Sequence, residues 1–385
     1  MKDQAQKQNE NNNSSAPEQL QTLRSKDYTN NNHYHTAEDI IINKFRKEGF
    51  SSLTTIQHKV LPIISRKINC LLVAPTGSGK TEAAVLPVFT MLAQQEHTNG
   101  TIRAIYITPL RALNNDVLRR IVQYAQSEGL RVEIRHGDTT ALARKKIVEN
   151  PPDVLITTPE SLGIVLTSDK MLAALKGLQW AIVDEVHELV ANERGAHLSL
   201  SLERLQAVSS QPITRIGLSA TVGNLKQAAK FICGADRRSA VLVDPASRGY
   251  DIDVRFVKGS LNNVAHFVTE YVKTNNIRGT ILFFTNTRDE AEYLGTILKN
   301  QSDIQVDVHH GSLSKEMREE TEHTLRSGMG GIVVCTSSLE LGLDIGSVDL
   351  VIHYGSPRQV SKLMQRIGRS RHNQRSFAKG LIVTN

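Results

Sequence analysis

Two adjacent carboxylates, Asp184 and Glu185, follow the apolar residues 180–183 in this chain of 385 residues. A short apolar run of this kind is typical of a buried parallel strand, and open α/β sheets bind ligands at the carboxyl ends of such strands. A buried carboxylate is unfavourable unless a partner compensates its charge. The pair therefore suggests a metal ligand beside a proton acceptor. A solvated Asp-Glu turn would give the same dipeptide, so a second feature has to decide between the two.

A glycine-rich segment provides that second feature. Residues 74–81 read Ala-Pro-Thr-Gly-Ser-Gly-Lys-Thr, after the apolar run 70–73 and before a helix-like stretch. Gly77 and Gly79 allow backbone N–H groups to point at phosphate oxygens, and the helix adds a partial positive charge at its N-terminus. The order of strand, glycine turn and helix predicts a phosphate-binding loop, in which Ala74 stands where the first glycine is usual.

The phosphate-binding loop gives the two carboxylates their expected roles. Lys80 supplies a positive charge for terminal phosphates, and Thr81 supplies a hydroxyl for Mg²⁺. We therefore expect Asp184 to be an outer ligand of the Mg²⁺ ion and Glu185 to be the general base for a water molecule. The nucleotide is expected to be held by Thr76, Gly77, Ser78, Gly79, Lys80 and Thr81.

Short β-branched runs alternate with helical patterns, which predicts an α/β fold of two tandem domains, each a parallel sheet flanked by helices. In the first domain, strands are expected at 71–73, 104–107, 154–157, 181–183 and 215–218, with a helix at 113–127. In the second, strands are expected at 280–284, 305–308, 331–335, 350–353 and 381–384. Thr287 and Glu290 form a capping-box pattern for a helix through Lys299.

Composition sets the expected domain boundaries. Residues 1–36 are rich in Asn, Gln and Ser and poor in branched apolar residues, which predicts a disordered tail. The first domain is expected at 37–244 and the second at 251–385, with a linker at 245–250. Only the first domain carries a phosphate loop.

The net charge of +7 is matched by a single segment, 355–385, which holds seven basic residues and no acidic one. A basic patch this local favours a polyanionic partner, either nucleotide phosphate or nucleic acid, although an ordinary solvated basic surface has the same composition. No apolar run is long enough to span a membrane. The three cysteines are far apart, which predicts buried thiols in a reducing, cytoplasmic compartment.

Polar clusters follow several of the predicted strands and would share one face of both domains. Each alone could be a helix cap, but together their hydroxyls and helix N-termini suit the backbone of a single nucleic-acid strand. The candidates for this contact are Pro109, Arg111, Thr158, Pro159, Thr285, Asn286, Thr336 and Ser337.

The densest basic cluster is Gln-Arg-Ile-Gly-Arg-Ser-Arg-His at 365–372. Arginines that face a phosphate loop from a second domain can stabilise charge on a transferred phosphoryl group. Arg366, Arg369 and Arg371 are therefore candidate catalytic residues. A basic helix face without catalytic function is the alternative.

The order of these motifs resembles a superfamily 2 helicase core, with two RecA-like domains of the DEAD/DEAH-box kind. The motifs are Gln57, the loop at 74–81, Thr-Pro-Leu-Arg-Ala-Leu at 108–113, Thr-Thr-Pro-Glu-Ser at 157–161, Asp-Glu-Val-His at 184–187, Ser-Ala-Thr at 219–221 and the cluster at 365–372. Together with 336–346 and 351–358, they resemble the Lhr (large helicase-related) family most closely. The resemblance covers residues 37–385.

The resemblance implies further site residues. Gln57 would read adenine, which suits a side-chain amide. Ser219, Thr221 and His187 would couple hydrolysis to domain motion. Gly342 and Asp344 would line the nucleotide from the second domain, and Arg369 would be an arginine finger. His372 stands where many relatives have arginine, so either Arg371 or His372 completes the contact with the γ-phosphate.

The resemblance also implies a function: an ATP- and Mg²⁺-dependent motor that moves 3′-to-5′ on single-stranded DNA and unwinds DNA or RNA–DNA duplexes in DNA repair. Such a core is expected to be monomeric and nucleoid-associated. Lhr-type enzymes carry a winged-helix domain and further C-terminal parts, which are absent or truncated here.

Three alternatives remain open at this stage. One is an RNA helicase or ribonucleoprotein remodeller of the DEAD-box kind. Another is a nucleic-acid-binding fragment without autonomous ATPase activity. A small-molecule kinase is the least favoured, because two sheets with one phosphate loop suit a motor better.

Overall fold

The computed structural model describes residues 37–75, 77–96, 100–109, 115–190, 192–220, 223–244, 249–302, 304–327, 330–339, 348–370 and 377–384. The predicted tail and residues 245–248 of the predicted linker lie outside this part of the chain. So do the predicted site residues Thr76, Arg111, Thr221, Gly342, Asp344, Arg371 and His372.

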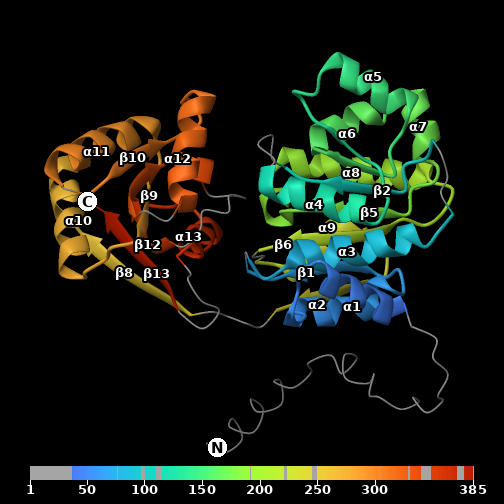
Figure 1. The fold of residues 1–385 in the computed structure, drawn as a ribbon, viewed down its shortest axis with the longest axis horizontal. Coiled ribbons are helices and arrows are strands. Elements are labelled where there is room, and N and C mark those ends of the chain that lie inside the picture. The colour runs from blue at the N-terminus through green and yellow to red at the C-terminus, as the bar shows by residue number, and fades with distance from the viewer. Residues whose placement is uncertain are drawn as a thin grey trace, which may run out of the picture. The chain divides into compact units, whose positions relative to one another are not determined.

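The first sheet has seven parallel strands in the order β3-β4-β2-β5-β6-β1-β7 (Figure 1). Its strands are β1 (Asn69–Val73), β2 (Ala104–Ile107), β3 (Val132–Arg135), β4 (Val154–Thr157), β5 (Trp180–Val183), β6 (Thr214–Ser219) and β7 (Ser239–Val243). Its helices are α1 (Ala37–Lys47), α2 (Thr55–Ile64), α3 (Lys80–Ala93), α4 (Asn115–Ser127), α5 (Ala141–Glu149), α6 (Pro159–Val165), α7 (Asp169–Leu175), α8 (Glu193–Val208) and α9 (Leu225–Cys233), with the short 3₁₀ helix η2 (Val186–Glu188).

The second sheet has six parallel strands in the order β10-β11-β9-β12-β13-β8. Its strands are β8 (Tyr250–Phe256), β9 (Thr280–Phe284), β10 (Val306–His309), β11 (Gly331–Cys335), β12 (Val348–Tyr354) and β13 (Ala378–Thr384). Its helices are α10 (Leu261–Thr274), α11 (Arg288–Gln301), α12 (Lys315–Ser327) and α13 (Val360–Ile367), with the 3₁₀ helix η3 (Ser337–Leu339).

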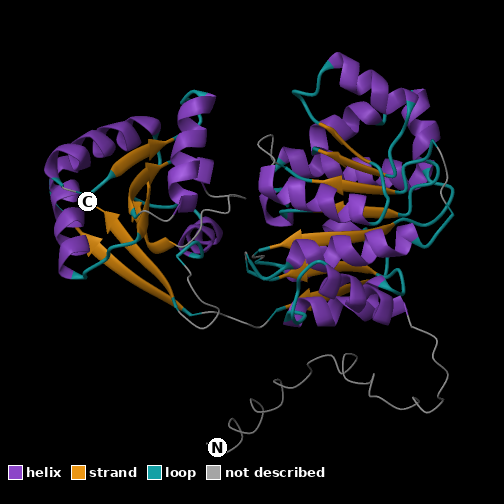
Figure 2. Cartoon of the chain, viewed as in Figure 1, coloured by secondary structure: helices purple, strands orange, loops and turns teal. Residues whose placement is uncertain are grey.

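Helices cover both faces of each sheet (Figure 2). In the first domain, side chains of α1 to α4 pack with one face of the sheet, and side chains of α5 to α9 pack with the other. In the second, α10 and α11 lie on one face, while α12 and α13 lie on the other. The central strands are buried on both faces, which explains why they read as continuous apolar runs. This confirms the predicted α/β class.

The edge strands are where the sequence prediction fell short. β3, β7 and β8 were not predicted, and each forms an edge of its sheet. Their residues are largely half-buried or exposed, so they lack the apolar run that marks a central strand. β8 begins at Tyr250, the last residue of the expected linker. The predicted capping box of Thr287 and Glu290 is present at the start of α11.

Strand order in the first sheet determines which loops meet. β1 lies beside β6, which lies beside β5, which lies beside β2. Because all these strands are parallel, their carboxyl ends share one edge of the sheet. The phosphate loop after β1, the carboxylates after β5 and the hydroxyl of Ser219 at the end of β6 therefore meet there.

Candidate nucleotide and nucleic-acid site

The phosphate loop connects β1 directly to α3. Gly77 has a φ of 73° and Gly79 a φ of 80°, a left-handed conformation that side chains other than glycine rarely adopt. A Cβ at position 79 would also lie 2.5 Å from Nε2 of Gln57. The backbone angle therefore favours glycine at position 79, and a larger residue there would also displace the Gln57 amide.

Lys80 is the cation at the centre of the loop. Its Nζ donates hydrogen bonds to the carbonyl oxygens of Ala74, at 2.6 Å, and Pro75, at 2.9 Å. Burial lowers the pKa of Lys80, while the charges of Glu185 and Asp184 act in the opposite direction. An ammonium group held by two backbone carbonyls can exchange them for phosphate oxygens.

Asp184 is held by two donors, one for each carboxylate oxygen. The Tyr106 hydroxyl on β2 donates to Oδ2 at 2.5 Å, and the backbone N–H of Glu185 donates to Oδ1 at 2.8 Å. Burial, followed by the negative charge of Glu185, raises the pKa of Asp184 to about 6. Lys80 and the Tyr106 hydrogen bond oppose that increase. The carboxylate is thus fixed in orientation by the protein itself.

Glu185 has a φ of 51°, a left-handed angle that is rare for residues other than glycine. Its Oε2 is buried and has no hydrogen-bond partner among the described residues, although Nδ1 of His187 lies 3.4 Å away. Burial raises the pKa of Glu185, and the charge of Lys80 opposes this. A buried carboxylate oxygen without a donor is suited to accept a proton from a bound water molecule.

His187 connects the carboxylate segment to the end of β6. Its Nδ1 lies 3.3 Å from the Ser219 hydroxyl and accepts a hydrogen bond from the N–H of Ala220 at 3.5 Å. Burial lowers the pKa of His187, which favours the neutral ring that can accept such bonds. The first two residues of the predicted Ser-Ala-Thr motif therefore contact the Asp-Glu-Val-His motif directly.

These groups fit a nucleoside triphosphate with Mg²⁺. The Ser78 hydroxyl and the Glu185 Oε2 are buried polar atoms without hydrogen-bond partners among the described residues. A phosphate oxygen and a water molecule would satisfy them. The chemistry of the donor set, with one ammonium, glycine-loop amides, a hydroxyl and two carboxylates, also suits this ligand.

Gln57 lies against the phosphate loop and is fully buried. Its Oε1 accepts from the backbone N–H of Thr54 at 2.9 Å, and its Nε2 donates to the carbonyl oxygen of Gly79 at 3.3 Å. The amide that the resemblance assigns to adenine thus already supports the loop, together with the Thr54 hydroxyl, which donates to the Ser78 carbonyl at 3.0 Å.

In the second domain, Arg366 is buried within the fold. Its guanidinium donates to Nε2 of His353 and lies 4.9 Å from the centre of the Phe284 ring. Arg369 follows the end of α13, where its N–H donates to the carbonyl oxygen of Arg366 at 3.0 Å. The burial of Arg366 favours an architectural role for it and leaves Arg369 as the better candidate for a phosphate contact.

The predicted nucleic-acid residues divide into buried and exposed ones. The side chains of Pro109, Thr158, Pro159 and Thr285 are buried. The Thr158 hydroxyl caps α6 by accepting from the N–H of Ser161. The candidates with exposed or half-exposed side chains are Asn286, Thr336 and Ser337. A strand at this surface would therefore meet backbone groups as well as side chains.

Sequence reasoning missed Arg135, which ends β3 at the same sheet edge. It is 9% exposed, and its Nη1 has no hydrogen-bond partner among the described residues. Burial and the neighbouring charge of Arg144 lower the pKa of Arg135. β3 is an edge strand without a continuous apolar run, so the sequence did not indicate that a strand ends at Arg135.

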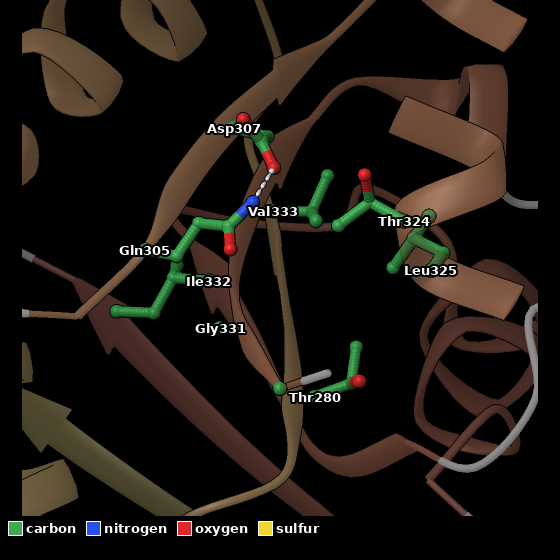
Figure 3. Close-up of a pocket in the computed structure, with 9 residues that line it drawn as sticks. Thr280, Gln305, Asp307, Thr324, Leu325, Gly331, Ile332 and Val333 are labelled. Carbon is green, nitrogen blue, oxygen red and sulfur yellow. Dashed lines mark hydrogen bonds between the residues drawn. The ribbon is translucent and has the colours of Figure 1, made fainter. Parts of the chain in front are cut away.

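Two hollows in the described structure lie away from this site. One has a volume of about 10 Å³ and lies where β9 and β11 begin, beside the hydrogen bond from Gln305 to Asp307 (Figure 3). It holds no more than one water molecule. The other, of about 600 Å³, lies along α9 and β7. Neither contains Lys80, Asp184 or Glu185.

The chain is similar to helicases along nearly all of its described length. A profile of the DEAD/DEAH box helicase family matches residues 54–228, and one of the helicase conserved C-terminal domain matches residues 263–373. The ATP-dependent helicase Lhr-Core of Saccharolobus solfataricus is 37% identical over 92% of this chain and 44% of its own length. The Lhr helicase/uracil glycosylase of Escherichia coli is 38% identical over 87% of this chain and 26% of its own length.

A solved structure supports the same relationship. The structure of Mycobacterium smegmatis helicase Lhr bound to single-stranded DNA and AMP-PNP matches with a TM-score of 0.74 at 36% identity, over 89% of this chain and 47% of that one. Fold, site and sequence together define a two-domain helicase core of the DEAD/DEAH box class. Within that class, the chain is similar to Lhr helicases over 87–92% of its own length. It spans less than half the length of these relatives.

No helix in the described part of the chain is long and apolar enough to cross a membrane. The three cysteines, Cys70, Cys233 and Cys335, are buried and form no disulfide with one another, as their spacing predicted.

Proposed function

We propose that this chain is an ATP-dependent motor that moves 3′-to-5′ along single-stranded DNA and separates DNA or RNA–DNA duplexes. The observation that carries the proposal is the meeting of Lys80, Asp184 and Glu185 at one sheet edge, with Oε2 of Glu185 buried and available to a water molecule. A second parallel-sheet domain with a basic terminal segment suits a motor that closes on its nucleotide.

Nucleotide binding is assigned to the loop and its neighbours. Lys80 and the loop amides hold the phosphates, and the Thr81 hydroxyl and the Asp184 carboxylate hold Mg²⁺, with Asp184 fixed by Tyr106. When bound, Mg²⁺ neutralises charge that develops on the phosphate oxygens. Gln57 supports the loop and is the assigned contact for adenine.

Hydrolysis is assigned to Glu185, which orients a water molecule and takes its proton at Oε2. Arg369 is the assigned arginine finger from the second domain, a role worth about 10³- to 10⁵-fold in rate where it has been removed. Arg371 or His372 would complete that contact, and Gly342 and Asp344 would line the nucleotide on the same side.

Coupling is assigned to the contact of His187 with Ser219, because it joins the carboxylate segment to the strand end that precedes Thr221. The nucleic-acid strand is assigned to the surface formed by the loops after β2, β4, β9 and β11. Single-stranded DNA is the preferred partner, since the similar M. smegmatis protein is described with it. RNA and RNA–DNA hybrids are retained as possible substrates.

Strand displacement with 3′- and 5′-tailed DNA and RNA–DNA duplexes tests this proposal. We expect ATP-dependent separation only when a 3′ single-stranded tail is present, together with stimulation of ATP hydrolysis by single-stranded DNA. Separation from a 5′ tail would refute the polarity. Stimulation by RNA but not by DNA would favour a DEAD-box-type RNA helicase, and hydrolysis that no nucleic acid stimulates would refute the motor.

Glu185→Gln tests the catalytic assignment within this function. The amide cannot take a proton, so we expect ATP hydrolysis to fall by about 10²- to 10⁴-fold while ATP binding persists. Glu193→Gln, an exposed carboxylate at the start of α8, is the matched control and should hydrolyse ATP normally. Normal hydrolysis by Glu185→Gln would show that another group activates the water.

A further inference from the structure

Arg194, in the first turn of α8, touches two segments that are distant in sequence. Its Nε donates to Oε1 of Glu160 in α6 at 2.5 Å, and its Nη2 donates to the carbonyl oxygen of Pro109 after β2. Pro109 is one of the residues that the proposed function assigns to nucleic acid, and Glu160 directly follows two others, Thr158 and Pro159. One guanidinium therefore joins the two segments.

The backbone of Arg194 is in turn fixed to the carboxylate segment. The next residue, Gly195, lies so close to the end of η2 that a Cβ there would be 1.9 Å from the carbonyl oxygen of Leu189. Asn192 strengthens this junction, because its side chain accepts from the N–H of Gly195 and donates to the carbonyl oxygen of Glu188. Only three residues separate Glu185 from Leu189, and they form η2.

The same face of α8 continues this contact with α6 (Figure 1). His197 lies three residues after Arg194 and therefore on the same side of the helix. A Cβ at Gly163 of α6 would be 2.5 Å from the His197 ring. A side chain larger than glycine at position 163 would therefore require the exposed His197 ring to move.

An ordinary surface ion pair would carry little weight. The side chains of Arg194 and Glu160 are 43% and 50% exposed, and pairs of that kind contribute little on average. Although burial acts to raise the pKa of Glu160, the hydrogen bond from Arg194 lowers it overall. Arg194 differs from such pairs because it also donates to the Pro109 carbonyl. It therefore connects three segments: α8, α6 and the residues after β2.

From this geometry we infer that Arg194 is a positioning residue that links the nucleic-acid loops at Pro109 and Glu160 to the carboxylate segment that hydrolyses ATP. The inference rests on the proposed function and deepens it. Displacement of either loop by a bound strand would be transmitted to Arg194, and through Gly195 to Leu189 and η2. Among the described residues, Arg194 donates to Glu160 and Pro109 and to no group assigned to the nucleotide, so it is inferred to act through these neighbours.

Arg194→Ala tests the link through the response to nucleic acid. We expect the rate of ATP hydrolysis without nucleic acid and the KM for ATP to stay within twofold of the wild type. The concentration of dT₂₀ oligonucleotide that gives half-maximal stimulation should rise, and the maximal stimulation should fall. The ratio of maximal stimulation to that concentration should fall by about 5- to 150-fold. Glu160→Ala, which keeps the bond to Pro109, should give a smaller change in the same direction.

Arg237→Ala is the matched control, because Arg237 forms an ion pair with Glu203 of the same helix α8 but bridges no nucleic-acid loop. It should respond to the oligonucleotide as the wild type does. Thermal unfolding of each variant checks that the chain is folded.

Each outcome decides the inference. Wild-type stimulation in Arg194→Ala would overturn it, and so would equal losses in Arg194→Ala and Arg237→Ala, because a general loss of stability would then explain both. If the wild-type chain shows no response to dT₂₀, the proposed function fails first, and the inference fails with it. A response by the wild type and Arg237→Ala that is lost in Arg194→Ala supports both.

Discussion

Replacement of Tyr106 by phenylalanine isolates the hydrogen bond that orients the Asp184 carboxylate. Tyr106 lies on β2 with 1% of its surface exposed, and its ring is part of the core beneath α3 and α4. Phenylalanine keeps that ring and removes only the hydroxyl that donates to Oδ2 of Asp184 at 2.5 Å. The change therefore affects the carboxylate while the volume of the core is nearly conserved.

The size of the effect follows from the two donors on the carboxylate. A hydrogen bond to a charged group contributes about 1.5–3 kcal/mol. The N–H of Glu185 still holds Oδ1 at 2.8 Å, so the carboxylate stays in place but can rotate. If orientation of Asp184 supports Mg²⁺ binding, the affinity of the nucleotide complex for Mg²⁺ should fall by about 10- to 100-fold.

Titration of Mg²⁺ into the protein with a fluorescent ATP analogue measures that affinity directly. Binding of the analogue without metal should be unchanged, because Lys80 and the loop remain intact. Tyr124→Phe is the matched control, since Tyr124 is a buried tyrosine of the same core cluster on α4. A Mg²⁺ affinity within twofold of the wild type in Tyr106→Phe would refute the view that this hydroxyl prepares the metal ligand.

Two further predictions concern stability. Burial, with the nearby charge of Arg366, lowers the pKa of His353 to about 4, so the folded chain keeps this ring neutral while the unfolded chain protonates it below about 6.5. The free energy of unfolding should therefore fall by up to about 3 kcal/mol as the pH falls from about 6.5 towards 4. Urea unfolding of His353→Gln should lack that part of the pH dependence. The same dependence of the unfolding free energy on pH in the variant and the wild type would contradict this role of His353. Gly195→Ala should destabilise the fold by at least about 1–3 kcal/mol in the same assay. The added Cβ would meet the carbonyl oxygen of Leu189, which belongs to the backbone and cannot move aside as a side chain could. Gly223→Ala, where nothing lies within 4 Å of the added Cβ, is its control, and equal effects of the two changes would exclude the contact with Leu189 as the cause.

The central strands were predictable because a strand buried on both faces has a continuous run of apolar residues in the sequence. β2, β4, β9 and β11 have the bounds expected from their apolar runs, and β10 is displaced by one residue. The edge strands β3, β7 and β8 pack on fewer neighbours, so their sequences are free to include polar residues at half-exposed positions. Local patterning cannot separate such strands from loops.

The candidate site divides in the same way. Lys80, Asp184 and Glu185 are visible in the sequence because glycine spacing and strand-end carboxylates are local patterns. Tyr106 and Arg194 are not, because a tyrosine in an apolar strand and an arginine in a helix are common. Their partners come from other elements, and only the sheet order places β2 beside β5 and α8 beside α6.

The separation of the two sheets has a consequence for synthesis of the chain. Every described strand of the first sheet lies before residue 244, and every described strand of the second lies after residue 249. The first domain therefore has all its sheet partners once β7 has left the ribosome, while the basic terminal segment is still to be translated. It can fold first, so that a complete phosphate loop exists before the arginines that are proposed to act on it.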